Sequence, residues 1–277
     1  MTRRPPVLAT ILLIWLCAGL TLQAAAVSDE PRARQTSREE AGRIRVPEGF
    51  LVEQVAAPPL VGHPMMACFD DRGRLFVAES AGSNLAADAL LKNPPSFIRL
   101  LEDTDGDGRF DKSTIFADRM TMPMGVLWYR GALYTASPPS LWRLVDRDGD
   151  GRADQRRELV TRFGFTGNAA DIHGPFLGPD GRLYWTDGRH GYTIQRPGAT
   201  PLTGEGARIF RCRPDGTDVE AFCGGGMDDP VEVAFTPEGE PLATVDILIG
   251  QPSRMDAIIY AIEGGAKPYF EPVLHEF

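Results

Sequence analysis

The sequence predicts an all-β fold, a β-propeller of four-stranded blades. The first of three supporting observations is a recurring hairpin, in which a short apolar strand, a tight turn at glycine and an alternating strand follow one another. The second is a set of further strand candidates between these hairpins. The third is that few windows keep a helical period for more than two turns. The turn glycines lie 58, 50 and 58 residues apart, at Gly73, Gly131, Gly181 and Gly239.

The units around these glycines share other features. Each opens on a proline a few residues upstream, and these are Pro64, Pro123, Pro175 and Pro230. The additional strand candidates are residues 96–101, 141–145, 207–212 and 257–262. Each unit thus offers about four strands in about 50 residues, which is typical of a propeller blade. A generic β-sandwich would also contain strands and turns, but not four similar units at this spacing.

The predicted propeller covers residues 46–277 and shows about four blades. Residues 267–277 run out of an incomplete unit that has no closing strand. We therefore expect the domain to be incomplete at its C-terminus and to be part of a propeller of six or more blades. Such a piece would expose sheet edges and an apolar blade face, which favours instability or association.

Residues 1–26 have the layout of a secretory signal peptide. Two early arginines give a positive start, residues 7–22 are almost continuously apolar, and three alanines at 24–26 suit cleavage. The apolar stretch is short for a membrane span. Cleavage predicts a secreted or periplasmic protein without a membrane span, and the alternative is an uncleaved N-terminus that keeps the protein at a membrane. Residues 27–45 are polar and predict a flexible lead-in.

The composition is that of a globular protein and narrows the choice of partners. The chain has 277 residues, of which 43% are hydrophobic and 24% charged, and its formal net charge is -9. Nucleic acids and anionic membrane surfaces are bound through basic patches, so the charge argues against both as the main partner.

Two acidic loops share the pattern Asp-x-Asp-Gly-Asp-Gly-Arg-x-Asp, 43 residues apart. Carboxylates packed this closely repel one another unless a cation lies among them, and Ca²⁺ is the usual occupant. An EF-hand would need flanking helices and a glutamate at position 12, where this chain has Thr114 and Arg157. We expect inter-strand calcium loops with a structural role, the alternative being solvated turns without an ion. The candidate ligands are Asp103, Asp105, Asp107, Asp111, Asp146, Asp148, Asp150 and Asp154.

The cysteines give little sign of a disulfide framework. Beyond the predicted signal peptide they are Cys68, Cys212 and Cys223. If the turn at residues 214–217 lies centrally in a hairpin, Cys212 faces Val219, so a bridge to Cys223 needs a shifted register. No Cys-x-x-Cys-His motif occurs, so this chain has no site for c-type haem attachment.

Several motifs together resemble one family of secreted β-propellers. They are Val-Pro-Glu-Gly-Phe-Leu-Val-Glu at 46–53, His-Pro-Met at 63–65, Gly-Arg-Leu-Phe-Val-Ala-Glu at 73–79, the acidic turn before Phe116-Ala117, Gly-Pro-Asp-Gly-Arg-Leu-Tyr at 178–184 and Arg-Ile-Phe-Arg-Cys-Arg-Pro-Asp-Gly-Thr at 208–217. In this order, from about residue 45 onward, they resemble the propellers described as membrane-bound dehydrogenases. These are relatives of the soluble glucose/sorbosone dehydrogenases that use pyrroloquinoline quinone (PQQ). The resemblance implies a propeller that oxidises a sugar or an alcohol.

The resemblance also implies a catalytic base. In the sugar dehydrogenases a histidine shortly before the Gly-Pro-Asp strand takes the hydroxyl proton, and the nearest candidate here is His173. An imidazole suits this role because its pKa lies near neutrality, and Asp171 could orient it or raise its basicity. Alternatively, His173 satisfies a backbone carbonyl in the propeller channel. Two departures from the family are a shorter gap before Gly-Pro-Asp and the replacement of Arg-Asn-Pro by Asp-Asp-Pro at 228–230.

Arg189 is the candidate contact for an anionic cofactor or a substrate carboxylate. It follows the hairpin at Gly181, and the ends of blade strands converge on the loop faces of a propeller. A guanidinium there could pair with a carboxylate through two hydrogen bonds. The alternative is a solvated loop residue.

Three functions remain open on the sequence. The first is a dehydrogenase that passes hydride from a carbohydrate or alcohol hydroxyl to PQQ, with a c-type cytochrome domain or partner as the electron acceptor. The second is a non-catalytic, calcium-stabilised propeller that binds a polysaccharide or a protein. The third is a metal-dependent lactone hydrolase, which would need Glu, Asn and Asp to converge on the central channel. The sequence has no Gly-x-Ser-x-Gly elbow, phosphate-binding loop, His-Glu-x-x-His motif or dinucleotide fingerprint.

Overall fold

The structure, a computed structural model, describes residues 44–167, 171–188, 190–196, 198–224, 227–248 and 254–265. The chain divides into two units, Met1–Gln54 and Val55–Phe277. In the first unit the described part is short, and a hydrogen bond from the Phe50 N–H to the Pro47 carbonyl (3.2 Å) closes a turn there. The predicted signal peptide and nearly all of the lead-in lie outside the described residues. No helix in the described residues is long and apolar enough to span a membrane.

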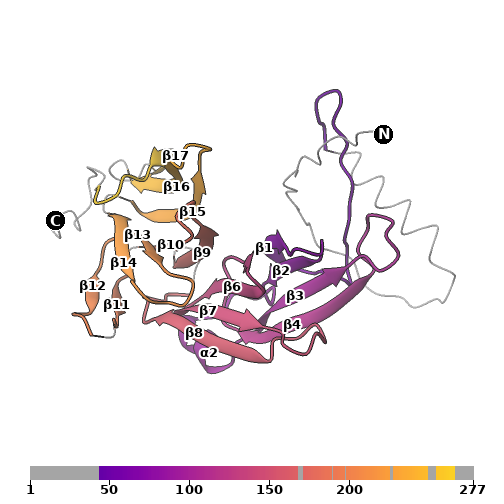
Figure 1. The fold of residues 1–277 in the computed structure, drawn as a ribbon, viewed down its shortest axis with the longest axis horizontal. Helices are drawn as coiled ribbons and strands as arrows, with labels where there is room; N and C mark the ends of the chain where they lie inside the picture. Colours follow the sequence, from indigo (N-terminus) through magenta and orange to yellow (C-terminus); the bar gives the residue numbers. More distant parts are fainter. Residues whose placement is uncertain are drawn as a thin grey trace. The chain divides into compact units, whose positions relative to one another are not determined.

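The second unit consists of antiparallel sheets that follow one another along the chain as the blades of a propeller (Figure 1). The first blade contains β1 (Pro64–Phe69), β2 (Leu75–Glu79), β3 (Ser96–Glu102) and β4 (Lys112–Met120). The second contains β5 (Leu127–Tyr129), β6 (Ala132–Ser137), β7 (Ser140–Val145) and β8 (Gln155–Thr161). A short helix, α2 (Ala87–Lys92), lies between β2 and β3.

The third and fourth blades vary the same plan. The third contains β9 (Ile172–Leu177), β10 (Leu183–Asp187), β13 (Arg208–Cys212) and β14 (Glu220–Gly224). A separate hairpin of β11 (Tyr192–Ile194) and β12 (Leu202–Gly204) is inserted between its second and third strands. The fourth contains β15 (Asp229–Phe235), β16 (Pro241–Leu248) and β17 (Arg254–Tyr260), three strands in the described part of the chain. The predicted all-β propeller with four successive blades is confirmed.

The recurring glycines join the first and second strands of each blade, as the sequence predicts. Their φ angles are positive, between 74° and 91° at Gly73, Gly131, Gly181 and Gly239. Residues with a Cβ avoid this conformation, so the glycine marks the turn in the sequence.

The hydrophobic core lies between successive blades. One cluster joins the first two blades through Phe76, Ile98 and Phe116 on one side and Leu133 and Leu144 on the other. A second joins the next pair, and it includes Tyr134, Leu141, Ile172, Leu183, Trp185 and Phe210. A third joins the last pair, and it includes Tyr184, Ile209, Phe222, Val233 and Val245.

Strand alternation explains how one blade serves two clusters. On β10, Leu183 and Trp185 face the second blade whereas Tyr184 faces the fourth. On β13, Phe210 faces the second blade and Ile209 faces the fourth. Because both faces of the sheet are buried, these strands are almost continuously apolar rather than alternating with polar residues.

The first strands of the blades lie next to one another, since β1 contacts β5, β5 contacts β9, and β9 contacts β15. Their backbones approach closely at Gly125, where a Cβ would lie 2.3 Å from the Gly174 carbonyl oxygen. The strands line a cavity of about 400 Å³, with Met66, Leu127 and Phe176 among its lining residues. The first strands are therefore the innermost ones, and residues at their ends are placed to form a site.

The cysteines of the described residues form no disulfide with one another. Arg211 pairs with Glu220 and Ile209 with Cys223, so Cys212 and Cys223 are not opposite one another. They also pack into different core clusters, on the two faces of the third blade. The structure thus agrees with the central turn that the sequence predicts.

We expect these thiols to resist modification in the folded protein. Burial raises the pKa of Cys68 and of Cys212 to about 12, so only about 10⁻⁴ of either thiol is ionised at pH 8, and the thiolate is the reactive form. In Ellman's assay of the Cys17→Ala chain at pH 8, thiol colour should develop only after guanidinium is added. Rapid reaction of the native protein at Cys212 would contradict the burial described here.

Candidate functional site

The two acidic loops occupy equivalent positions in neighbouring blades. Residues 103–111 connect β3 to β4, and residues 146–154 connect β7 to β8. Both loops thus join the third and fourth strands of a blade, and the flanking elements are strands. The predicted inter-strand placement is confirmed.

The first aspartate of each loop organises its turn. The Asp103 carboxylate accepts hydrogen bonds from the N–H groups of Gly106 (2.8 Å) and Gly108 (2.9 Å). Asp146 accepts the same pair from Gly149 (2.7 Å) and Gly151 (3.0 Å). The N–H of Gly108, followed by that of Gly106, holds the pKa of Asp103 below its ordinary value. This carboxylate is ionised at neutral pH.

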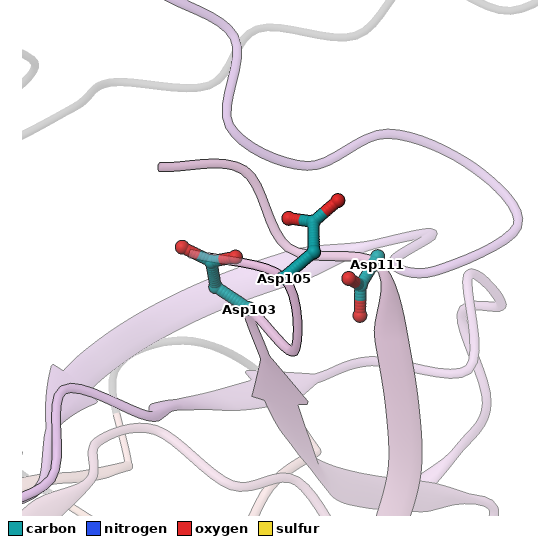
Figure 2. A group of neighbouring side chains, drawn as sticks. All are labelled: Asp103, Asp105 and Asp111. Atoms are coloured by element: carbon teal, nitrogen blue, oxygen red, sulfur yellow. The ribbon is translucent and has the colours of Figure 1, made fainter. Parts of the chain in front are cut away.

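Three carboxylates gather in each loop. Asp103, Asp105 and Asp111 each offer one oxygen, and these oxygens lie within 4.8 Å of one another. In Figure 2 these side chains lie around the loop that leads from the end of β3 to the start of β4. The second loop gathers Asp146, Asp148 and Asp154 in the same way. Carboxylate oxygens at this spacing fit a hard cation such as Ca²⁺.

The fourth predicted ligand of each loop is not among the gathered carboxylates. Asp107 instead accepts a hydrogen bond from the Arg109 N–H (2.8 Å), and Asp150 accepts one from the Arg152 N–H (2.8 Å). Each loop thus brings together three of the four carboxylates proposed from the sequence.

His173 lies at the inner edge of the third blade. It is on β9, is 5% exposed, and pairs across the sheet with Thr186 of β10. Its Nε2 lies 3.7 Å from Oδ1 of Asp229, on the innermost strand of the fourth blade. Asp229, which the sequence reading treated only as a departure from the family, is thus a partner of the proposed base.

Asp171 lies just before β9 and is fully buried. Its carboxylate accepts hydrogen bonds from the N–H groups of Thr166 (3.0 Å) and Gly167 (3.1 Å). These bonds hold the chain that leads into β9. The orienting role proposed for Asp171 toward His173 stays a prediction.

A polar residue ends the second strand of the first three blades, at Glu79, Ser137 and Asp187, and in the fourth blade Asp246 lies near the end of β16, opposite the first residue of β15. In the first blade Glu79 accepts hydrogen bonds from the N–H groups of Gly62 and His63. In the second, Ser137 Oγ accepts them from Thr121 (3.0 Å) and Met122 (3.2 Å). This position therefore ties the end of the second strand to the chain that leads into the first.

Asp187 does not make the corresponding hydrogen bonds. It is 1% exposed, and neither of its carboxylate oxygens has a hydrogen-bond partner. Asp171, rather than Asp187, accepts the hydrogen bonds from the chain that leads into β9. Burial, and after it the charge of Asp171, raise the pKa of Asp187 well above its ordinary value.

We call the charged residues at this end of the third and fourth blades the His173 cluster. Asp228 and Asp229 begin the fourth blade, where the Asp228 N–H donates to the Asp246 carbonyl (3.0 Å) and Asp229 pairs with Asp246. The described residues contribute one guanidinium to this cluster, that of Arg208. Arg208 lies opposite Asp187 in the register of β13 and β10. The members are Asp171, His173, Asp187, Arg208, Asp228, Asp229 and Asp246.

The Arg208 side chain turns away from Asp187. A Cβ added to Gly224 would lie 2.1 Å from Arg208 Cδ, so the side chain lies over Gly224 on the outer strand. Its Nη1 also donates a hydrogen bond to the Ala207 carbonyl (3.0 Å). The His173 cluster is consequently acidic. Arg189, the sequence candidate for an anionic cofactor, lies outside the described residues.

Five members of the cluster were not found as site residues from the sequence, namely Asp187, Arg208, Asp228, Asp229 and Asp246. Asp187 and Asp246 could have been predicted from the polar residue that recurs late in the alternating strand of the repeated hairpin. Alignment of the four units on the leucine after the turn places Glu79, Ser137, Asp187 and Asp246 at one position.

Residues 36–237 match the family described as Domain of unknown function (DUF7133). The chain belongs to this family. A search of curated proteins finds no match to the DUF7133 chain.

Solved structures share the fold of the DUF7133 chain at low identity. The holo form of the pyranose dehydrogenase PQQ domain from Coprinopsis cinerea is 16% identical, with a TM-score of 0.51, and the match covers 79% of this chain and 55% of that chain. A Trichoderma reesei protein described as Carbohydrate-Active Enzymes Family AA12, in its iodide structure, is 15% identical, with a TM-score of 0.50, and the match covers 79% of this chain and 58% of that chain. The chain thus spans little more than half the length of either structure. At this identity the likeness shows the propeller fold alone.

The described residues of the DUF7133 chain do not fit PQQ at His173. PQQ carries several carboxylates, which need cationic partners. The His173 cluster offers the carboxyls of Asp171, Asp187, Asp228, Asp229 and Asp246, and its one guanidinium lies over Gly224. An anionic cofactor would be repelled by this arrangement.

Proposed function

We propose that this propeller oxidises a carbohydrate or alcohol hydroxyl, with His173 as the general base. The observation that carries the proposal is the place of His173, on an innermost strand and 3.7 Å from the Asp229 carboxylate. The family resemblance of the motifs around it and the fold shared with a pyranose dehydrogenase domain support the proposal. The protein is secreted or periplasmic in this proposal, and a c-type cytochrome domain or partner takes up the electrons.

The chemistry assigned to the chain is a proton transfer. His173 Nε2 takes the proton of the substrate hydroxyl, and Asp229 Oδ1 stabilises the imidazolium that results. The side chain of His173 is 6% exposed and that of Asp229 is 23% exposed, so a hydroxyl would approach from the Asp229 side. The reaction also needs a two-electron acceptor. Because the His173 cluster does not fit PQQ, such a cofactor would be held by other residues, for which Arg189 remains the candidate.

Dye reduction tests this proposal. Purified protein is given PQQ and Ca²⁺, and reduction of an electron-acceptor dye is followed with a panel of aldoses and alcohols. His173→Ala should lower the rate at least about a hundredfold, as expected for the loss of a general base. His63→Ala is the matched control, because the hydrogen bonds of His63 to Glu79 and Ser80 are made by its backbone N–H and carbonyl. Absence of reduction together with absence of PQQ binding would refute the dehydrogenase, whereas undiminished reduction by His173→Ala would refute only the assigned base.

A metal-dependent hydrolase is the second candidate, and the acidity of the His173 cluster favours it. Carboxylates of β10, β15 and β16 and of the residue before β9 lie at the same end of the blades. Such a group suits a divalent cation that polarises an ester carbonyl. Hydrolysis of lactones in the presence of Ca²⁺ and without PQQ would favour this candidate over the first.

The proposal includes a structural Ca²⁺ in each acidic loop. At a Ca²⁺ concentration about 100 times the dissociation constant, an ion should add about 2.7 kcal/mol to the free energy of unfolding. Asp105→Asn removes a gathered carboxylate, whereas Asp107→Asn removes the same charge from the same loop outside that group. Thermal unfolding in Ca²⁺ and in EGTA should show a loss of Ca²⁺ stabilisation in the first variant that exceeds the loss in the second. Equal midpoints with and without Ca²⁺ in the parent protein would show that the loops are solvated turns.

A further inference from the structure

Two buried carboxylates lie where the second strand of the third blade ends, and the charge of Asp171 acts on Asp187 there. Asp187 pairs in register with Ile172, the residue after Asp171, and the Gly188 N–H donates to the Asp171 carbonyl (2.9 Å). Asp171 is 0% and Asp187 is 1% exposed. Two neighbouring carboxylates that are both removed from water repel one another strongly if both are charged.

The partners of the two carboxylates differ. Asp171 accepts hydrogen bonds from Thr166 and Gly167. Neither oxygen of Asp187 has a hydrogen-bond partner. In the first two blades the residue at the same position is satisfied by backbone N–H groups, so the unpartnered state of Asp187 is not a property of the repeat.

A proton on Asp187 would remove the repulsion between the two carboxyl groups, but it would leave the other Asp187 oxygen without a hydrogen-bond donor. A buried polar group left in this state destabilises the fold. A cation between the two side chains would satisfy the Asp187 oxygens and remove the repulsion at once.

The described side chains do not supply that cation. The guanidinium of Arg208, across the sheet from Asp187, turns away over Gly224. The Nε2 of His173 faces Asp229 instead. A free ion is the remaining source of positive charge in the described part of the chain.

We infer that Asp171 and Asp187 hold a hard divalent cation, of the Ca²⁺ or Mg²⁺ class, between the start of β9 and the end of β10. This site is separate from the exposed acidic loops. It rests on neither candidate reaction, since its evidence is the burial and the missing partners of Asp187. The ion would fix the end of β10 to the chain that leads into β9, as Glu79 does in the first blade.

The test uses the full chain with the acidic loops disabled by Asp105→Asn and Asp148→Asn. Ca²⁺ and Mg²⁺ are titrated by calorimetry, and thermal unfolding is followed with each ion and with EDTA. One binding site should remain, and at about 100 times its dissociation constant the ion should raise the folding equilibrium constant about 100-fold. Asp187→Asn in this background should abolish both effects, whereas Asp88→Asn, which removes an exposed charge on α2, should preserve them.

Two outcomes would overturn the inference. One is absence of Ca²⁺ and Mg²⁺ binding in the loop-disabled protein, in which case Asp187 is simply protonated. The other is binding that Asp187→Asn leaves unchanged. If the loop-disabled protein does not fold, equilibrium dialysis of the unmodified chain replaces the titration. The bound ions per chain should then fall by one in Asp187→Asn, and an unchanged number would overturn the site.

Discussion

Replacing Trp185 by alanine should lower the free energy of unfolding by about 3–5 kcal/mol. The indole is 0% exposed and belongs to the cluster that joins the second and third blades. It stacks on Phe210, with ring centroids 5.5 Å apart, and meets the edge of Phe163 at 5.9 Å. Truncation would leave a cavity at a contact between blades, where both neighbouring sheets lose packing.

Guanidinium unfolding monitored by circular dichroism measures this loss. The midpoint should fall while the slope with denaturant stays constant, which shows that stability and not compactness has changed. Phe69→Ala is the matched control, because Phe69 is also aromatic and on a strand but is 62% exposed. It should change stability by about 0.5 kcal/mol or less. Similar losses for the two variants would mean that the cluster between the blades does not hold them together.

The blades could be predicted from the sequence because their signals are local. A glycine with positive φ at Gly73 or Gly181 marks a turn, and apolar residues on both sides mark the strands that it joins. The acidic loops could be placed for the same reason, since they lie between strand candidates of the same unit. The inserted hairpin of β11 and β12 was not predicted, because its strands are only three residues long each.

The candidate site was predicted only in part, because it depends on contacts between strands that are distant in the sequence. His173 could be named from its motif, but its neighbour Asp229 is on another blade and needs the packing of β9 against β15. The sequence around Asp187 resembles that around Glu79 and Ser137. The hydrogen-bond partners of the Asp187 side chain nevertheless differ from theirs. Whether a strand-end carboxylate finds N–H groups depends on the chain that leads into the neighbouring strand, which no local pattern reveals.

Replacing Glu79 by alanine should also cost about 3–5 kcal/mol, the range expected when one partner of a buried ion pair is removed. Its side chain is 2% exposed and forms an ion pair with Arg99, whose side chain is 20% exposed. It also accepts the backbone N–H groups of Gly62 and His63. Alanine would leave the guanidinium without its counter-charge and two N–H groups without an acceptor, where β1 meets the end of β2.

The control is an ion pair of the same blade that remains in contact with water. Glu102 pairs with Lys112 at 2.6 Å, with side chains 23% and 56% exposed, and Glu102→Ala should cost about 1 kcal/mol or less. Glu79→Gln should fall between the two, because its amide oxygen can still accept an N–H but carries no charge. Denaturant unfolding of the three variants decides the point. If Glu79→Ala costs no more than Glu102→Ala, the strand-end position does not tie the blade together, and the comparison that singles out Asp187 loses its basis.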